Sequence, residues 1–125
     1  MENKELQQYI QDIIQLQSQI KFFHWQTKMV GKHQALDRTF EAIIENVNEF
    51  TETGIGKYGR IEVSGLSYTF VDFSNEAVDS VIDGAIDNCI KLTDSLDARI
   101  DTDLLNLRDE LLGKLNKTKY LLTLK

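Results

Sequence analysis

The chain has no proline among its 125 residues, only one cysteine, and 14 basic residues against 20 acidic ones. The absence of proline removes the strongest helix breaker, so long uninterrupted helices are allowed. One cysteine, Cys89, rules out an intrachain disulfide, and we expect it to be a buried thiol rather than a nucleophile. The formal net charge of −6 argues against a phosphate-binding surface, so nucleic acid is not an expected partner.

Long apolar runs are also missing. No stretch approaches the roughly 18 consecutive apolar residues of a transmembrane helix, so we expect no membrane association. Residues 1–5 lack the basic flank and apolar core of a secretory signal. Together with the single cysteine, this favours the cytoplasm of a bacterial cell or host as the location. The length favours one domain with its own hydrophobic core.

Apolar residues recur at helical spacing in four segments, which predicts an all-α domain covering residues 1–125. We expect helices at about 4–29, 34–57, 75–98 and 102–123. The first helix is expected to stop at Gly31, because glycine accepts the left-handed conformation that ends helices. The second is expected to weaken at Gly54 and Gly56 and to end by Gly59, because each internal glycine costs about 1 kcal/mol. Ser74 is the expected N-cap of the third helix, and Asp101 or Thr102 that of the fourth.

Residues 59–73 break the helical pattern with β-branched and aromatic residues around Gly65. This composition leaves two alternatives, a short hairpin and an extended crossover. About fourteen extended residues reach roughly 45 Å, enough to travel the length of a ~26-residue helix. Because the other two links are short, the helices should form two antiparallel pairs. We therefore expect a ferritin-like four-helix bundle with a long crossover between helices 2 and 3.

His24 is the first residue that points toward chemistry. It lies beside Trp25 near the end of the first helix and shares a face with Ile13 and Ile20, so its ring should point inward. Taken alone, such a histidine indicates a hydrogen-bonded core residue more often than a metal ligand. His33 precedes or opens the second helix, and we expect it at the surface.

The second helix adds carboxylates that change the interpretation of His24. Asp37, Glu41 and Glu45 recur every four residues and so stack on one side of that helix. Such a row ordinarily indicates a solvated acidic face. Combined with an imidazole, however, oxygen ligands suit iron or a similar divalent metal. The chain has no Glu-x-x-His sequence, so a di-iron site inside the bundle core is not expected.

The sequence Phe23-His24-Trp25, followed after a short link by Leu36-Asp37-Arg38-Thr39-Phe40-Glu41, resembles the first two helices of Dps-type miniferritins. That family typically shows Phe-His-Trp and then Leu-His-x-x-Phe followed by an acid. The resemblance covers roughly residues 10–56. It implies a ferritin-like fold, shells of usually twelve subunits, and oxidation of ferrous iron at sites shared between two subunits. Small divergent members of this kind also occur in bacteriophages.

By this resemblance, His24 corresponds to the family's first histidine ligand, and Asp37 stands where the family has its second histidine. Glu41 matches a following acid, and Glu52 matches the acid contributed across the dimer. Gly56 stands where the family has its last ligand, a glutamate, and glycine cannot bind a metal. The resemblance therefore implies iron bound by His24, Asp37, Glu41 and Glu52 in a homo-oligomer, from a dimer up to a dodecamer.

Two functions follow from these observations. The first is a protein that binds iron and oxidises and stores it at carboxylate and histidine sites shared between subunits. The alternative is a non-enzymatic bundle with a degenerate metal site, which acts in assembly, for example in a phage. In that case the aromatic segment 68–73 would be the contact surface, since exposed aromatic residues mark interfaces. A DNA-protecting role is disfavoured by the negative charge and the lack of a basic tail.

Overall fold

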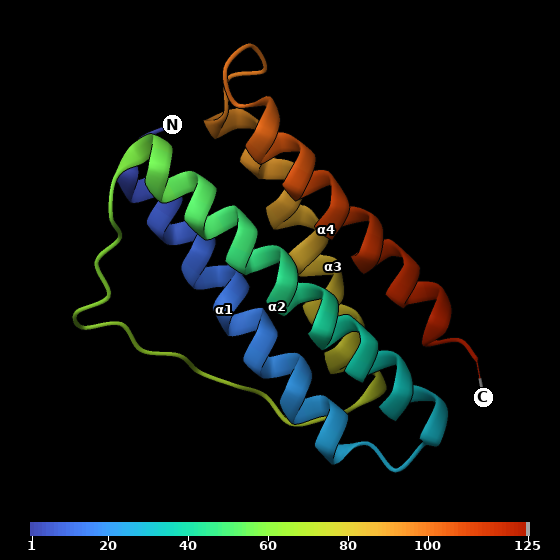
Figure 1. Cartoon of the computed structure of the whole chain (residues 1–125). Helices are drawn as coiled ribbons and strands as arrows, with labels where there is room; N and C mark the ends of the chain where they lie inside the picture. Colours follow the sequence, from blue (N-terminus) through green and yellow to red (C-terminus); the bar gives the residue numbers. More distant parts are fainter. Residues whose placement is uncertain (125) are drawn as a thin grey trace.

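A computed structural model of the chain describes residues 1–124 (Figure 1). The elements are α1 (Asn3–Gln26), α2 (Val30–Tyr58), α3 (Asn75–Lys91), the 3-10 turn η1 (Leu92–Ser95) and α4 (Thr102–Leu121). No strand occurs in these residues, so the prediction of an all-α chain is confirmed. Over the same residues, none of the helices has the length and apolar character that a membrane span requires.

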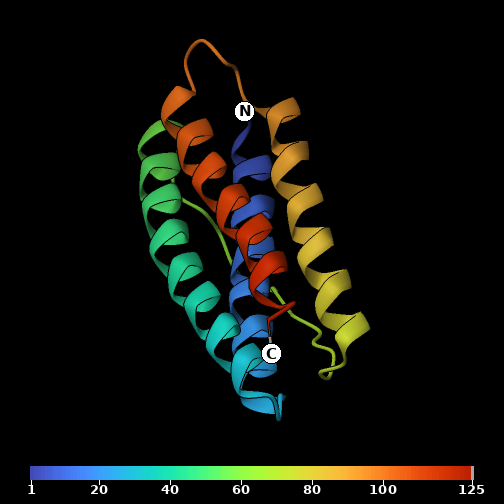
Figure 2. The same cartoon turned by 90° about the vertical axis from the view of Figure 1, so that its right-hand side faces the viewer.

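The four helices lie side by side along one direction, with α1 antiparallel to α2 and α3 antiparallel to α4 (Figures 1 and 2). Around the bundle, α1 packs on α2, α2 on α4 and α4 on α3, whereas α1 and α3 meet least. Both α2 and α3 run from the same end of the bundle to the other (Figure 1). The largest fully buried apolar side chains come from all four helices: Leu6, Ile13, Ile20, Phe23, Leu36, Ile43, Phe50, Ile82, Leu104, Leu111 and Leu115.

The connection between α2 and α3, residues 59–74, is extended and returns along the outside of α1 (Figure 1). The hairpin alternative is therefore wrong. One tight turn interrupts the segment, where the Leu66 N–H donates to the Val63 carbonyl at 3.1 Å. Gly65 occupies this turn with φ +79°, a conformation that side chains with a Cβ rarely adopt.

Polar side chains on one face of α1 hold this connection in place. The amide of Gln19 donates to the carbonyl of Val71 and accepts from its N–H, both at 2.9 Å. Asn3, Gln7, Gln15 and Gln26 make further bonds to residues 58–73 in the same order along the chain. The sequence contains the signal, because the intervals between these side chains are four or eight residues: Asn3, Gln7, Gln15 and Gln19. These amides replace the strand partner that an extended backbone would otherwise lack.

The helix boundaries differ from prediction mainly at the first link. α1 ends at Gln26 rather than near 29, and α2 begins at Val30 rather than near 34. Gly31 was expected to end the first helix, but it lies in the first turn of α2. The chain turns earlier because Thr27 is extended, and its hydroxyl accepts the N–H of Met29 at 3.3 Å.

The ends of the other helices follow the sequence more closely. Ser74 caps α3, accepting the Ala77 N–H at 2.9 Å, as predicted. The third helix ends at Lys91 and tightens into η1, so the expected end near 98 is wrong. Asp101 takes the N-cap position of α4, but its side chain makes no cap hydrogen bond. α4 ends at Leu121, two residues before the expected end.

The Asp101 carboxylate is fully buried and joins the end of α2 to the start of α4. It accepts hydrogen bonds from the Tyr58 hydroxyl and from the Asp97 N–H, and it lies 3.2 Å from Nζ of Lys57. Burial by itself raises the pKa of Asp101, but these three donors together lower it below its usual value. The carboxylate is therefore held in its charged form by groups from the end of α2 and from the link between η1 and α4.

Cys89 is fully buried, which confirms the prediction of an inaccessible thiol. Burial raises the pKa of this thiol, and its sulfur lies 3.7 Å from the Tyr9 hydroxyl. The neighbouring Arg108 is also buried and donates to the Cys89 carbonyl and the Thr93 hydroxyl, at 2.8 and 2.7 Å. This guanidinium ties α4 to the junction of α3 and η1.

Candidate metal site

His24 lies in the last turn of α1 and is only 7% exposed, so its inward orientation is as predicted. Its Nδ1 is 2.7 Å from the backbone carbonyl of His33. A ring nitrogen that bonds a carbonyl carries the proton, so this contact leaves a lone pair on Nε2 in the neutral ring. Nε2 lies 3.8 Å from Oδ1 of Asp37. The imidazole therefore presents its free nitrogen toward a carboxylate.

His33 completes a reciprocal pair that the sequence interpretation missed. Its Nδ1 lies 2.9 Å from the His24 carbonyl, one of the last carbonyls of α1, which have no partner within the helix. The two imidazole rings stack with centroids 3.7 Å apart and planes 22° apart. His33 is exposed, as expected, but it both caps α1 and fixes the orientation of the His24 ring. The sequence signal for this pair was the spacing of nine residues between the two histidines, which lie on either side of a short link.

Asp37 is shared between the imidazole and a lysine. Oδ1 of Asp37 lies 3.4 Å from Nζ of Lys21, and its side chain is 42% exposed. The Lys21 ammonium also lies 4.6 Å from the ring centroid of Phe40 and 5.6 Å from that of Trp25. Ligands about 2.1 Å from one metal ion and at right angles to each other are about 3 Å apart. His24 and Asp37 are thus within 1 Å of a separation that one ion could span.

The structure does not bring the other two predicted ligands to this place within one chain. Glu41 is exposed and lines a groove between α2 and α4, away from α1. Glu52 is exposed fifteen residues beyond Asp37 on the same helix, about 22 Å along its axis. In residues 1–124, no three His, Cys, Asp or Glu side chains converge as a metal-binding group. Of the four predicted ligands, one chain therefore brings only His24 and Asp37 together, and we call this pair the half-site.

Residues 24–122 match a family of unknown function (DUF5856). The chain belongs to this family. No curated protein matches the chain, and no solved structure does. The part of the chain that matches begins at His24 and includes Asp37, Glu41 and Glu52, together with the long connection and both later helices.

An exposed aromatic surface lies next to the half-site. We call it the aromatic ridge, and it consists of Phe22, Trp25, Tyr68 and Phe70. The ring centroid of Phe22 lies 6.0 Å from that of Trp25 and 5.0 Å from that of Phe70. Tyr68 lies 6.2 Å from Phe70. Trp25 is 64% exposed, an unusual position for the largest apolar side chain in the chain. The ridge joins the end of α1 to the long connection.

A second apolar feature continues from the ridge. A groove of about 470 Å³ runs between α1, α2 and the long connection. We call it the apolar groove, and Ile14, Ile44, Ile61, Val63, Leu66 and Tyr68 are among the residues that line it. Tyr68 belongs to both features, so ridge and groove form one continuous surface. Contiguous exposed apolar surface of this kind marks sites of protein association.

Proposed function

We propose that this DUF5856 chain is a Dps- and ferritin-like protein that binds iron, and oxidises and stores it, at sites shared between two subunits. The observation that carries the proposal is the His24 imidazole, whose Nδ1 is bonded to the His33 carbonyl while Nε2 faces Asp37. A histidine ligand whose second nitrogen is anchored to a carbonyl is the usual arrangement at protein metal sites. Parallel α2 and α3 with a long connection between them are consistent with a ferritin-like bundle.

The donor set fits iron only if a second copy contributes. His24 and Asp37 supply one nitrogen and one carboxylate, which are suitable ligands for non-haem iron but too few to hold it. Glu52, which is remote in the same chain, would complete the site from the other subunit. Lys21 would have to leave Asp37 when the metal binds. Its ion pair is partly exposed, and such pairs contribute only up to about 1 kcal/mol.

Iron(II) is the substrate in this proposal, and each ion gives one electron to dioxygen or peroxide as it becomes iron(III). The protein's part is to bind and orient the ion through His24 and the carboxylates. The groove between α2 and α4 is lined by four glutamates and two basic residues, an excess of two negative charges that attracts cationic iron: Glu41, Glu45, Glu49 and Glu110 with Arg38 and Lys114. This groove is where ferric product would collect.

The proposed partner is a second copy of the chain, in assemblies from a dimer to a dodecamer. The aromatic ridge exposes Phe22, Trp25 and Phe70, and the apolar groove beside it is hollow. In a two-fold dimer, the same surface of each subunit meets its copy, so each ridge can enter the groove of the other subunit. Aromatic side chains are enriched at interface centres, and burial of this surface would bring a second set of carboxylates toward each half-site.

The test of iron chemistry is aerobic oxidation of ferrous iron by the metal-stripped protein, followed optically. We expect a rate well above buffer, reduced to the buffer rate in His24→Ala and in Glu52→Ala. Asp79→Ala removes an exposed carboxylate on α3, away from the half-site, and should leave the rate unchanged. The proposal fails if the wild-type rate equals the buffer rate, or if the His24→Ala, Glu52→Ala double variant oxidises iron normally.

The test of assembly is the molar mass in solution, measured by light scattering. Trp25→Ala with Phe70→Ala removes the ridge and should shift the assembly to smaller species. Tyr120→Ala is the matched control, because Tyr120 is equally exposed at 63% but lies on α4 outside the ridge. Equal masses for the wild type and the ridge variant would rule out this surface as the interface.

A second candidate is a non-enzymatic ferritin-like bundle that acts in assembly, for example in a phage. The observation that favours it is the ammonium of Lys21 on Asp37, which places a cation of the protein where the metal would bind. In addition, Gly56 lies at the surface where the Dps family has its last glutamate ligand, and glycine has no side chain to bind a metal. A wild-type protein that assembles but oxidises iron no faster than buffer would select this candidate.

A further inference from the structure

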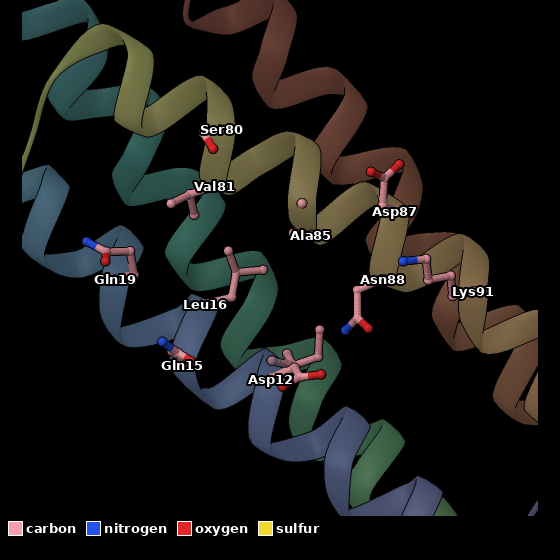
Figure 3. A pocket seen from close by; sticks show the side chains of 12 residues that line it. Asp12, Gln15, Leu16, Gln19, Ser80, Val81, Ala85, Asp87, Asn88 and Lys91 are labelled. Atoms are coloured by element: carbon pink, nitrogen blue, oxygen red, sulfur yellow. The ribbon is translucent and has the colours of Figure 1, made fainter. Parts of the chain in front are cut away.

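A cleft of about 510 Å³ lies between α1 and α3, and His24 is not among the residues that line it (Figure 3). It exists because the side chains that α3 presents there are small. Ser80, Gly84 and Ala85 line this wall, and a Cβ added at Gly84 would meet nothing within 4 Å. The volume falls in the range of about 300–1,000 Å³ that is typical of small-molecule sites.

The cleft has an apolar floor and a polar rim. Leu16 from α1 and Val81 and Ala85 from α3 form apolar parts of the lining, and Leu16 and Ala85 are also buried in the core. Asp12 and Asn88 lie on opposite walls, one on each helix (Figure 3). A ligand bound here would therefore contact hydrocarbon along its body and a carboxylate at one end.

Asp12 is the charged group of this cleft that has no positively charged partner. Its Oδ1 accepts one hydrogen bond from the Gln8 amide at 2.9 Å, and no ion pair to Asp12 is present within residues 1–124. Burial raises the pKa of Asp12, an effect that the Gln8 bond only partly offsets. A cation placed beside this carboxylate would relieve the cost of its partial burial.

The two other charged groups that line the cleft, Asp87 and Lys91, have opposite formal charges. Asp87 and Lys91 lie on α3, four residues apart and therefore on the same side of the helix. Tyr68 lies outside the lining of the cleft; its pKa is raised by burial and by the charge of Asp12, and it supplies no positive charge to Asp12. The net demand of the cleft is therefore for one positive charge near Asp12.

We propose that this cleft binds a small primary amine with an apolar body, its ammonium on the Asp12 carboxylate and its alkyl chain on Leu16, Val81 and Ala85. The amide oxygens of Gln15 and Asn88 line the same cleft and can accept further N–H groups. This site is separate from the half-site at His24 and does not depend on iron binding.

Hexylamine is a suitable probe, and hexanol is its neutral counterpart of the same length. Titration of the full chain, followed by backbone amide NMR, should give saturable shifts at Leu16 and Ala85 with hexylamine. Hexanol should bind at least tenfold more weakly, because it lacks the charge that pairs with Asp12. Asp12→Asn keeps the shape of the side chain and should reduce hexylamine affinity to that of hexanol.

Asp79→Asn is the matched control, since Asp79 is an exposed carboxylate on α3 that does not line the cleft. It should leave hexylamine binding unchanged, and circular dichroism should show that both variants are folded. Equal affinities for hexylamine and hexanol would overturn the proposal. So would unchanged binding by Asp12→Asn, or shifts spread over the acidic surface without saturation at the cleft.

Discussion

Two glycines two residues apart near the end of α2 provide a direct test of the packing between α1 and α2. A Cβ added at Gly54 would lie 2.5 Å from Cδ1 of Leu6 and 3.3 Å from Cδ2. A Cβ added at Gly56 would meet nothing within 4 Å. Because Leu6 is fully buried, its methyl groups have little room to move. Gly54→Ala should therefore leave the chain less stable than Gly56→Ala does.

The magnitudes follow from two effects. Replacing a helical glycine by alanine stabilises a helix by about 0.5–1 kcal/mol, and this gain applies to both variants. Overpacking a filled core costs about 1–3 kcal/mol, and this cost applies only to Gly54→Ala. Gly56→Ala should therefore be more stable than the wild type. Gly54→Ala should be less stable than Gly56→Ala by about 1–3 kcal/mol, since the helix gain cancels in the comparison.

The free energy of unfolding in urea measures this difference, provided that both variants unfold with the same dependence on denaturant. A Leu6→Ala background supplies a further control. Removal of the leucine methyl groups frees the space for the new Cβ. The Leu6→Ala, Gly54→Ala double variant should therefore be no less stable than Leu6→Ala alone. Equal stabilities of Gly54→Ala and Gly56→Ala would refute the close approach of α1 and α2 at Leu6.

Three further outcomes are expected. Asp101→Asn should lower stability at pH 7 by about 1–3 kcal/mol, since the charged acceptor of the Tyr58 hydroxyl is lost. The lowered pKa of Asp101 means that its contribution is complete above the usual value of 3.8 and is lost as the pH falls through the folded-state pKa. Urea unfolding between pH 7 and 2 should therefore show a smaller acid loss in Asp101→Asn than in the wild type. Gln19→Ala should expose the Val71 amide to faster hydrogen exchange without unfolding the bundle, and unchanged exchange would contradict the role given to this side chain. Arg108→Met should destabilise the chain by about 1–3 kcal/mol in thermal unfolding, because the buried Cys89 carbonyl and Thr93 hydroxyl lose their donor.

The metal half-site shows how far sequence reasoning reaches. His24 and Asp37 were selected from residue type, from helical spacing and from the resemblance to Dps-type miniferritins, and the structure places Nε2 and Oδ1 3.8 Å apart. The reciprocal bonds with His33 were missed because they depend on backbone carbonyls at a link whose start was expected three residues too late. Glu41 faces α4 and not α1, a distinction that a four-residue repeat on one helix cannot make.

The sequence by itself determined the all-α class, the four helices, the cap at Ser74 and the burial of Cys89. Helical periodicity and caps are local properties, and local interactions decide them. Only the tertiary structure decided that residues 59–74 lie extended along α1, that the Lys21 ammonium lies beside the Asp37 carboxylate, and that a cleft opens between α1 and α3. Each of these depends on how side chains distant in sequence meet, and that follows from the packing of whole helices rather than from the pattern within any one of them.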